Sequence, residues 1–137
     1  MATTRRLGSR AAHPTSSALQ ASDVALRAAI VGLTVATGFI HLTLGGLLFT
    51  LNGIGYVVAA IAMAIPLGPA IRFRWLIRLG LIAYAAVAIV AWYLDGPRYD
   101  VAYLAKAIEI ALIGLLALDF VRHDGSPLVV LRRELRR

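Results

Sequence analysis

Residues 101–121 read VAYLAKAIEIALIGLLALDFV, and only three of these side chains, Lys106, Glu109 and Asp119, carry a charge. A run of about 20 predominantly apolar residues is the length that an α-helix needs to cross the ~30 Å hydrocarbon core of a bilayer. A surface helix of a soluble protein would instead show polar residues along one whole face. The run therefore predicts a transmembrane helix.

Three further apolar runs precede this one along the chain, at about residues 28–51, 54–71 and 75–94. Ser22 and Asp23 can cap the start of the first run, because their side chains accept hydrogen bonds from free backbone N–H groups. We expect Asn52-Gly53 to close it, since both residues tolerate the left-handed backbone that ends helices. The fold class predicted from these runs is an all-α integral membrane bundle of four transmembrane helices.

Composition supports this class. The chain of 137 residues is 60% hydrophobic and only 15% charged, which exceeds the apolar content that a soluble domain of this size can bury. Cysteine is absent, so disulfides, thiolate-bound metals and covalently attached haem are excluded. The net charge of +7 comes from basic residues beside the apolar runs, which indicates topology signals rather than a nucleic-acid surface.

The arginines predict the orientation of the bundle. Twelve basic residues fall on one side of a four-span arrangement: Arg5, Arg6, Arg10, Arg27, Arg72, Arg74, Arg78, Arg122, Arg132, Arg133, Arg136 and Arg137. Only Arg98 and Lys106 of the 14 basic residues lie elsewhere. Basic residues are enriched in cytoplasmic segments, so we expect both termini in the cytoplasm of a bacterial cell, with the protein in the inner (cell) membrane.

Two basic tails flank the predicted transmembrane domain of residues 22–122. Residues 1–21 form a polar N-terminal tail and residues 123–137 an interfacial C-terminal tail. Asp124-Gly125 should end the fourth span. Beyond it, leucines recur at helical spacing among arginines, which predicts a short amphipathic helix that binds anionic lipid through Leu128, Leu131, Leu135, Arg132, Arg133 and Arg136. The alternative is a frayed basic tail.

An intramembrane polar cluster is the candidate site. A charged side chain at bilayer depth is costly and needs a partner. Lys106 and Glu109 are three residues apart, so they share one helix face, and His41 lies at a similar depth in the first span. One interpretation is a structural ion pair that fixes helix register. The other is a proton or ion relay through Glu109 and His41.

Other polar residues carry less chemistry. Asp119 and Arg122 have the same spacing of three, which predicts an ion pair at the inner interface. A haem held by two histidines would need a second histidine inside the bundle, and His13 and His123 belong to the tails. Neither a phosphate loop nor a metal-ligand or catalytic pattern is present in the sequence. We therefore expect no cofactor, no metal and no enzymatic activity.

Several short motifs add a family resemblance. They are Gly38-Phe39-Ile40-His41-Leu42, Asn52-Gly53-Ile54-Gly55-Tyr56, Gly96-Pro97-Arg98 and Tyr103-Leu104-Ala105-Lys106-Ala107-Ile108-Glu109. Over residues 38–117 the chain resembles small four-helix membrane proteins of bacteria that have no assigned activity. The resemblance implies that His41, Lys106 and Glu109 belong to a shared core.

Two functions are consistent with this sequence. The leading expectation is a non-catalytic accessory subunit that binds other membrane protein subunits in a larger complex, for which respiratory and photosynthetic electron-transfer complexes are candidates. The alternative is a small homo-oligomeric transporter or channel that is coupled to protons through Glu109. Nucleic acid is not an expected partner.

Overall fold

The computed structural model describes residues 16–65, 68, 73–126, 129, 132 and 136. Within them lie the helices α1 (Ser16–Thr43), α2 (Leu47–Ala64), α4 (Arg74–Asp95) and α5 (Asp100–His123). Each is long and apolar enough to cross a membrane. The predicted all-α architecture with four helices of membrane-spanning length is therefore confirmed, and the chain has the features of a multi-pass membrane protein.

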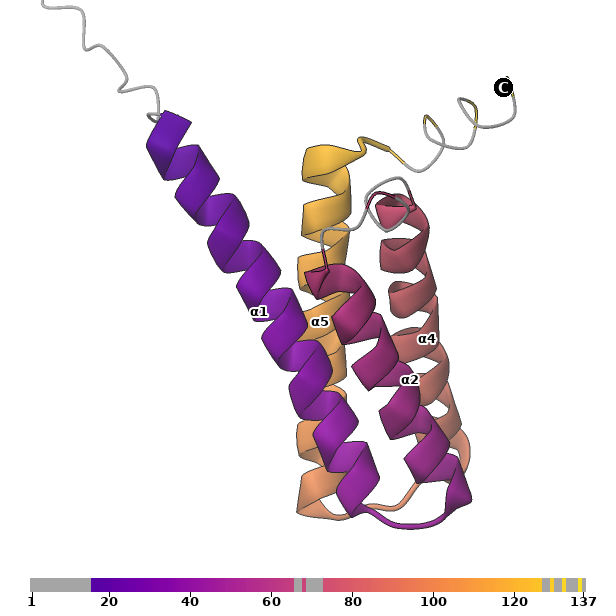
Figure 1. Ribbon diagram of the computed structural model, residues 1–137. Coiled ribbons are helices and arrows are strands. Elements are labelled where there is room, and N and C mark those ends of the chain that lie inside the picture. Colours follow the sequence, from indigo (N-terminus) through magenta and orange to yellow (C-terminus); the bar gives the residue numbers. More distant parts are fainter. Residues whose placement is uncertain are drawn as a thin grey trace, which may run out of the picture.

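The four helices form an antiparallel bundle that is open at one end (Figure 1). α1 packs on α2 and α5, and α4 packs on α5 and, less extensively, on α2. The short connections α1–α2 and α4–α5 lie together at one end, called the loop end here. α1 begins and α5 finishes at the opposite end, called the termini end, where α1 leans away from the other helices (Figure 1).

The first two helices have different bounds from those predicted. α1 begins twelve residues before Ala28 and ends at Thr43, and Asn52-Gly53 lies inside α2 rather than in a turn. The turn is made instead by Gly45 (φ 72°) and Gly46 (φ 87°), a backbone region that glycine adopts without steric cost. Ser22 is likewise not a cap, because it lies within α1 and its hydroxyl donates to the Leu19 carbonyl.

Gly53 has another role, at the crossing of α1 and α2. A Cβ atom on Gly53 would lie 2.8 Å from the backbone oxygen of Gly38 and 2.6 Å from Leu42 Cγ. Membrane helices associate through small residues that let backbones approach. The prediction of a helix end at Asn52-Gly53 is therefore wrong, because a glycine for close packing and a glycine for a turn look alike in sequence.

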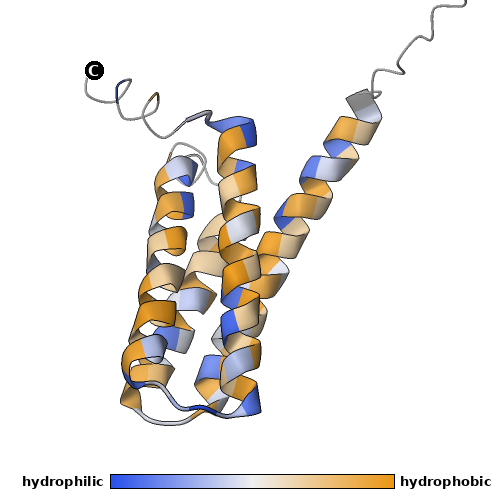
Figure 2. Cartoon of the chain, turned by 180° about the vertical axis from the view of Figure 1, so that it is seen from behind, coloured by the Kyte–Doolittle hydropathy of each residue, from blue (hydrophilic) through white to orange (hydrophobic). Residues whose placement is uncertain are grey.

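The outer faces of the helices are apolar over most of their length. Figure 2 shows hydrophobic colouring along the helices, with hydrophilic segments mostly towards the two ends of the bundle. Large side chains such as Phe39, Val58, Val87 and Ile110 are more than half exposed. A soluble protein rarely exposes so much contiguous apolar surface, but a bilayer accommodates it.

The termini end closes α5 as expected. The helix stops at His123, Asp124 follows it, and Gly125 has a φ of 80°, as in common helix C-terminal motifs. The predicted amphipathic helix falls largely outside the described residues, which beyond Ser126 include only Val129, Arg132 and Arg136. Within the described part, no separate C-terminal helix is seen.

Candidate functional site

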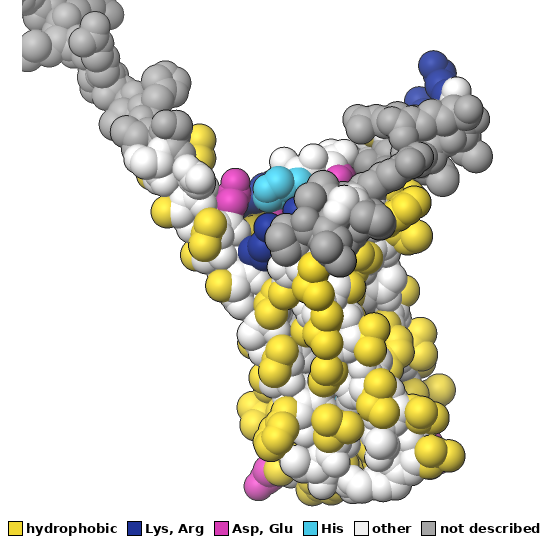
Figure 3. Space-filling view, viewed as in Figure 1, with side chains coloured by type: hydrophobic (Ala, Val, Ile, Leu, Met, Phe, Trp, Pro, Cys, Tyr) yellow, Lys and Arg dark blue, Asp and Glu magenta, His cyan; other side chains and the backbone are white. Residues whose placement is uncertain are grey.

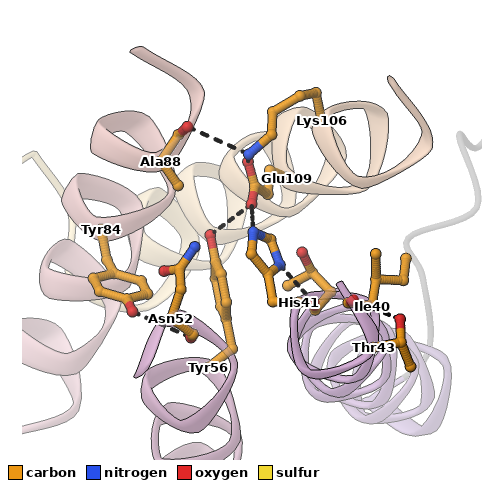
Figure 4. Close-up of polar contacts among 10 residues, drawn as sticks. Ile40, His41, Thr43, Asn52, Tyr56, Tyr84, Ala88, Lys106 and Glu109 are labelled. Carbon is orange, nitrogen blue, oxygen red and sulfur yellow. Dashed lines mark hydrogen bonds and ion pairs between the residues drawn. The ribbon is translucent and has the colours of Figure 1, made fainter. Parts of the chain in front are cut away.

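The carboxylate of Glu109 is the centre of a buried polar cluster between the helices. Its side chain is fully buried. Oε2 accepts a hydrogen bond from Lys106 Nζ at 2.6 Å, and Oε1 accepts one from the Tyr56 hydroxyl at 3.1 Å. His41 Nε2 lies 3.5 Å from the same Oε1 atom. Figure 4 shows these three side chains converging on Glu109. His41, Tyr56, Lys106 and Glu109 are called the Glu109 cluster below.

Three helices position this cluster, and the fourth completes it. α5 contributes Lys106 and Glu109, α1 contributes His41 from its last turn, and α2 contributes Tyr56. Lys106 Nζ also donates to the Ala88 carbonyl of α4 at 3.3 Å. Glu109 lies nine residues into α5, and therefore roughly 13 Å from its start. The structure thus places the three sequence-predicted residues together, within the loop-end half of the bundle.

The hydrogen-bond partner of His41 Nδ1 determines whether Nε2 carries a hydrogen in the neutral ring. Nδ1 lies 2.8 Å from the backbone carbonyl oxygen of Thr37. A carbonyl only accepts hydrogen bonds, so its partner assigns the ring hydrogen to Nδ1. In the neutral ring, Nε2 then presents a lone pair to the Glu109 carboxylate. The 3.5 Å separation exceeds the usual length of an N–H···O hydrogen bond. One added proton between Nε2 and Oε1 would turn this contact into a hydrogen bond.

The charge of the cluster follows from that proton. Without it, Lys106 and Glu109 form a neutral ion pair beside a neutral imidazole. With it, the cluster carries one positive charge in a region where uncompensated charge is costly. Proton binding here is therefore favoured by any negative charge that enters nearby.

A cavity of about 540 Å³ reaches the cluster from the loop end. Its walls are mainly apolar and aromatic, and His41 and Lys106 both line it, whereas Glu109 lies behind them. The wall residues come from α2, α4, α5 and the two loop-end connections, and include Leu44, Leu48, Phe49, Tyr84, Val87, Trp92, Pro97 and Ala105. An apolar cavity of this size with a few convergent polar groups is typical of a small-molecule site.

A second polar cluster lies at the termini end. Arg78 is 4% exposed, and its Nε donates to Asp119 Oδ2 at 2.6 Å. Its Nη1 pairs with Asp124. His123 Nδ1 lies 3.1 Å from Asp119 Oδ1. Arg27 and Arg74 line the same cavity as Arg78 and Asp119. Arg27, Arg74, Arg78, Asp119 and His123 are called the arginine cluster below.

The predicted ion pair between Asp119 and Arg122 is wrong. Asp119 is 4% exposed and faces the interior of the bundle, where Arg78 Nε donates to its Oδ2. His123 Nδ1 lies 3.0 Å from the Asp119 backbone carbonyl oxygen and 3.1 Å from Oδ1. Arg122 is exposed on α5. A spacing of three residues allows two side chains to meet on a helix, but a buried carboxylate is better stabilised by a buried partner from a neighbouring helix.

Sequence reasoning missed two residues of these clusters. Tyr56 had a signal, because a phenol within an apolar span needs a hydrogen-bond acceptor. Arg78 is one of the arginines that predict the cytoplasmic side, but it lies one helical turn inside α4 and is buried. Its position four residues after Arg74 on an apolar helix could have indicated an inward-facing charge.

Neither a metal-ligand group among the described residues nor a similarity to known proteins helps to assign a function to these clusters. Within the described residues, no group of three or more His, Asp or Glu side chains is arranged to hold a metal ion. Comparison of the chain with protein-family models, with curated proteins and with solved structures finds no match. The bacterial four-helix proteins that the motifs resemble are therefore not identified as its family, and the functional argument depends on the geometry of the two clusters.

Proposed function

We propose that this protein binds a small, lipophilic organic anion in the loop-end cavity together with a proton at the Glu109 cluster, as a proton-coupled transporter does. The observation that carries the proposal is the His41 geometry: Nδ1 lies 2.8 Å from the Thr37 carbonyl oxygen, and Nε2 lies 3.5 Å from an oxygen of the buried Glu109 carboxylate. This arrangement has a place for one more proton beside a ligand-sized cavity.

The chemistry of the cavity supports an anionic ligand with an apolar body. Its walls supply apolar surface, and the Lys106 ammonium supplies a cationic hydrogen-bond donor. The acidic residue of the lining, Asp95, is the exposed last residue of α4. When the cluster gains a proton it becomes positive, and a bound carboxylate would neutralise that charge. By thermodynamic linkage, if proton binding increases the affinity for the anion, then anion binding increases the affinity for the proton by the same factor.

Each of the four helices places polar side chains around Glu109, and these are the groups that could bind or release a proton there. These are His41 from α1, Tyr56 from α2 and Lys106 from α5. From α4, the Tyr84 ring packs against Tyr56 at 5.0 Å between centroids, and its hydroxyl donates to the Asn52 carbonyl. Of these side chains, only the His41 imidazole presents a ring nitrogen without a second described partner to the carboxylate, so the proposal places the added proton there.

Calorimetry of benzoate binding tests the proposal. The full chain in phosphatidylcholine nanodiscs would be titrated with benzoate and with benzyl alcohol, its neutral analogue, in buffers of different ionisation enthalpy. We expect benzoate to bind more tightly than the alcohol and to bring proton uptake with it. The double variant Lys106→Met/Glu109→Gln should lose both effects, whereas the exposed substitution Asp100→Asn on the same helix should keep them. Equal binding of both compounds, or benzoate binding without proton uptake, would contradict the proposal.

The orientation is part of the same proposal. With the arginine-rich ends in the cytoplasm, the loop-end cavity opens on the outer side of the bacterial inner membrane, because basic residues favour the inside. Reporter fusions test this directly. We expect a cytoplasmic reporter after Arg137 to be active and one inserted at Gly96 to be silent; the reverse pattern would place the cavity on the inside.

A second candidate, the accessory subunit, is favoured by the free part of α1. This helix of 28 residues extends about 42 Å, more than a hydrocarbon core requires. Its first turns lean away from the bundle (Figure 1), with Leu19 and Val24 53% and 65% exposed. A second membrane protein could cover this surface. Native gel electrophoresis of the solubilised source membrane tests the idea, and migration of the chain without partner proteins would count against it.

A further inference from the structure

The termini-end cavity has a chemistry of its own. It has a volume of about 480 Å³ and lies between the first half of α1, the start of α4 and the last turns of α5. Its polar lining includes three guanidinium groups, Arg27, Arg74 and Arg78, and two carboxylates, Asp23 and Asp119. Figure 3 shows basic, acidic and histidine side chains gathered between α1 and the rest of the bundle at this end.

The carboxylates in this cavity already have basic residues as neighbours. Asp119 is held by Arg78 and His123, and Asp23 Oδ2 lies 3.8 Å from His123 Nε2. Arg78 is bonded to Asp119 and also to Asp124. These contacts satisfy one of the three guanidinium groups and leave the other two.

Arg27 and Arg74 each have a buried nitrogen without a partner. Arg27 Nη2 and Arg74 Nε are buried, and neither has a hydrogen-bond acceptor in the part of the chain that the structure describes. A buried N–H donor without an acceptor is costly, more so when it belongs to a charged group. Two such donors from different helices, on the wall of one cavity, indicate that an anion with several oxygens would complete the site.

We propose that the termini-end cavity binds a phosphate group between Arg27 of α1 and Arg74 of α4. Guanidinium groups match phosphate oxygens in geometry and charge. Arg74 is the first residue of α4, so the free N–H groups at the start of that helix add to the positive potential. The cavity lies at the end of the spans, at the depth where lipid headgroups would meet the protein. A phospholipid headgroup and a soluble phosphate share the chemistry that this site selects.

Ligand binding to purified protein with two phosphate sources tests the proposal. The full chain in a neutral detergent would be titrated with phosphatidylglycerol in mixed micelles and, separately, with inorganic phosphate, while thermal unfolding and retained lipid by native mass spectrometry are followed. Arg27→Gln and Arg74→Gln are the test variants. Arg122→Gln is the matched control, because Arg122 is an exposed arginine at the same end of α5 that does not line the cavity.

We expect each test variant to weaken phosphate-group binding about tenfold or more, as loss of a charge-assisted hydrogen bond would, and the control to bind like the wild type. Saturable binding of phosphatidylglycerol alone would identify a lipid headgroup as the source, and binding of inorganic phosphate as well would show that the group suffices. Equal weakening in Arg122→Gln would mean diffuse attraction to basic residues, and it would overturn the site. Absence of saturable binding to both probes would overturn it too.

Discussion

The Glu109 cluster and the arginine cluster are both built on α5, about ten residues and therefore roughly 15 Å apart, yet they solve different problems. In the Glu109 cluster every charged group has a partner, and its acid is closed off behind His41 and Lys106. In the arginine cluster two guanidinium nitrogens have no partner among the described residues. The comparison indicates that charges deep in the bundle have to balance among themselves, whereas charges near a headgroup region can remain open to a ligand.

The largest expected effect comes from a substitution that removes the charge balance of the Glu109 cluster. Glu109→Gln removes the negative charge that balances the Lys106 ammonium, whose other described partner is the neutral Ala88 carbonyl. Removal of one member of a buried ion pair typically costs about 3–5 kcal/mol, and we expect a loss of that order in the free energy of unfolding. The double variant Lys106→Met/Glu109→Gln should recover most of it. Both values are measurable by unfolding in mixed detergent, and a double variant no more stable than Glu109→Gln would mean that the two side chains are not coupled.

A smaller effect is expected from the equivalent change at the termini end. Arg78→Gln removes the main partner of Asp119, but His123 and interfacial water remain to compensate. We expect a loss of about 1.5–3 kcal/mol, the range for hydrogen bonds to charged groups. Arg122→Gln should change stability by less than about 0.5 kcal/mol, as for other surface substitutions. If Arg122→Gln proves the more damaging of the two in the same unfolding assay, the helix-neighbour pair predicted from sequence is right after all.

A substitution at the crossing of α1 and α2 should affect the two clusters differently. Gly53→Ala would press a Cβ atom against the Gly38 carbonyl, and overpacking typically costs about 1–3 kcal/mol. Displacement of α1 from α2 should loosen the contact of His41 with Glu109 and leave Arg78 and Asp119 in place. Gly114→Ala is the control, because nothing lies within 4 Å of the added atom. Cysteine crosslinking between α1 and α5 at the loop end, and between α4 and α5 at the termini end, would measure the two displacements. Equal changes at both ends would argue against two independent clusters.

The sequence predicts this architecture well because apolar length is the dominant signal in a bilayer. The spans at 75–94 and 101–121 fall within one or two residues of α4 and α5. The bounds of the first two helices differ because Gly45-Gly46 and Asn52-Gly53 are equivalent turn signals until one knows that Gly53 meets α1. The pairing of Lys106 with Glu109 needs only their spacing on one helix. Tyr56 and Arg78 depend on which helix faces which, and one sequence does not contain that information.

The protonation of His41 is the most direct test of the proposed proton site. Nitrogen-15 NMR of histidine-labelled protein in nanodiscs distinguishes the two ring nitrogens, with His13→Gln and His123→Gln variants to assign the signals. We predict that Nδ1 carries a hydrogen throughout the titration and that Nε2 gains one on acidification, since the Thr37 carbonyl fixes the first and Glu109 receives the second. The opposite neutral tautomer, with a bare Nδ1 and a hydrogen always present on Nε2, would show that His41 is a permanent donor to Glu109 and that the cluster has no place for an additional proton.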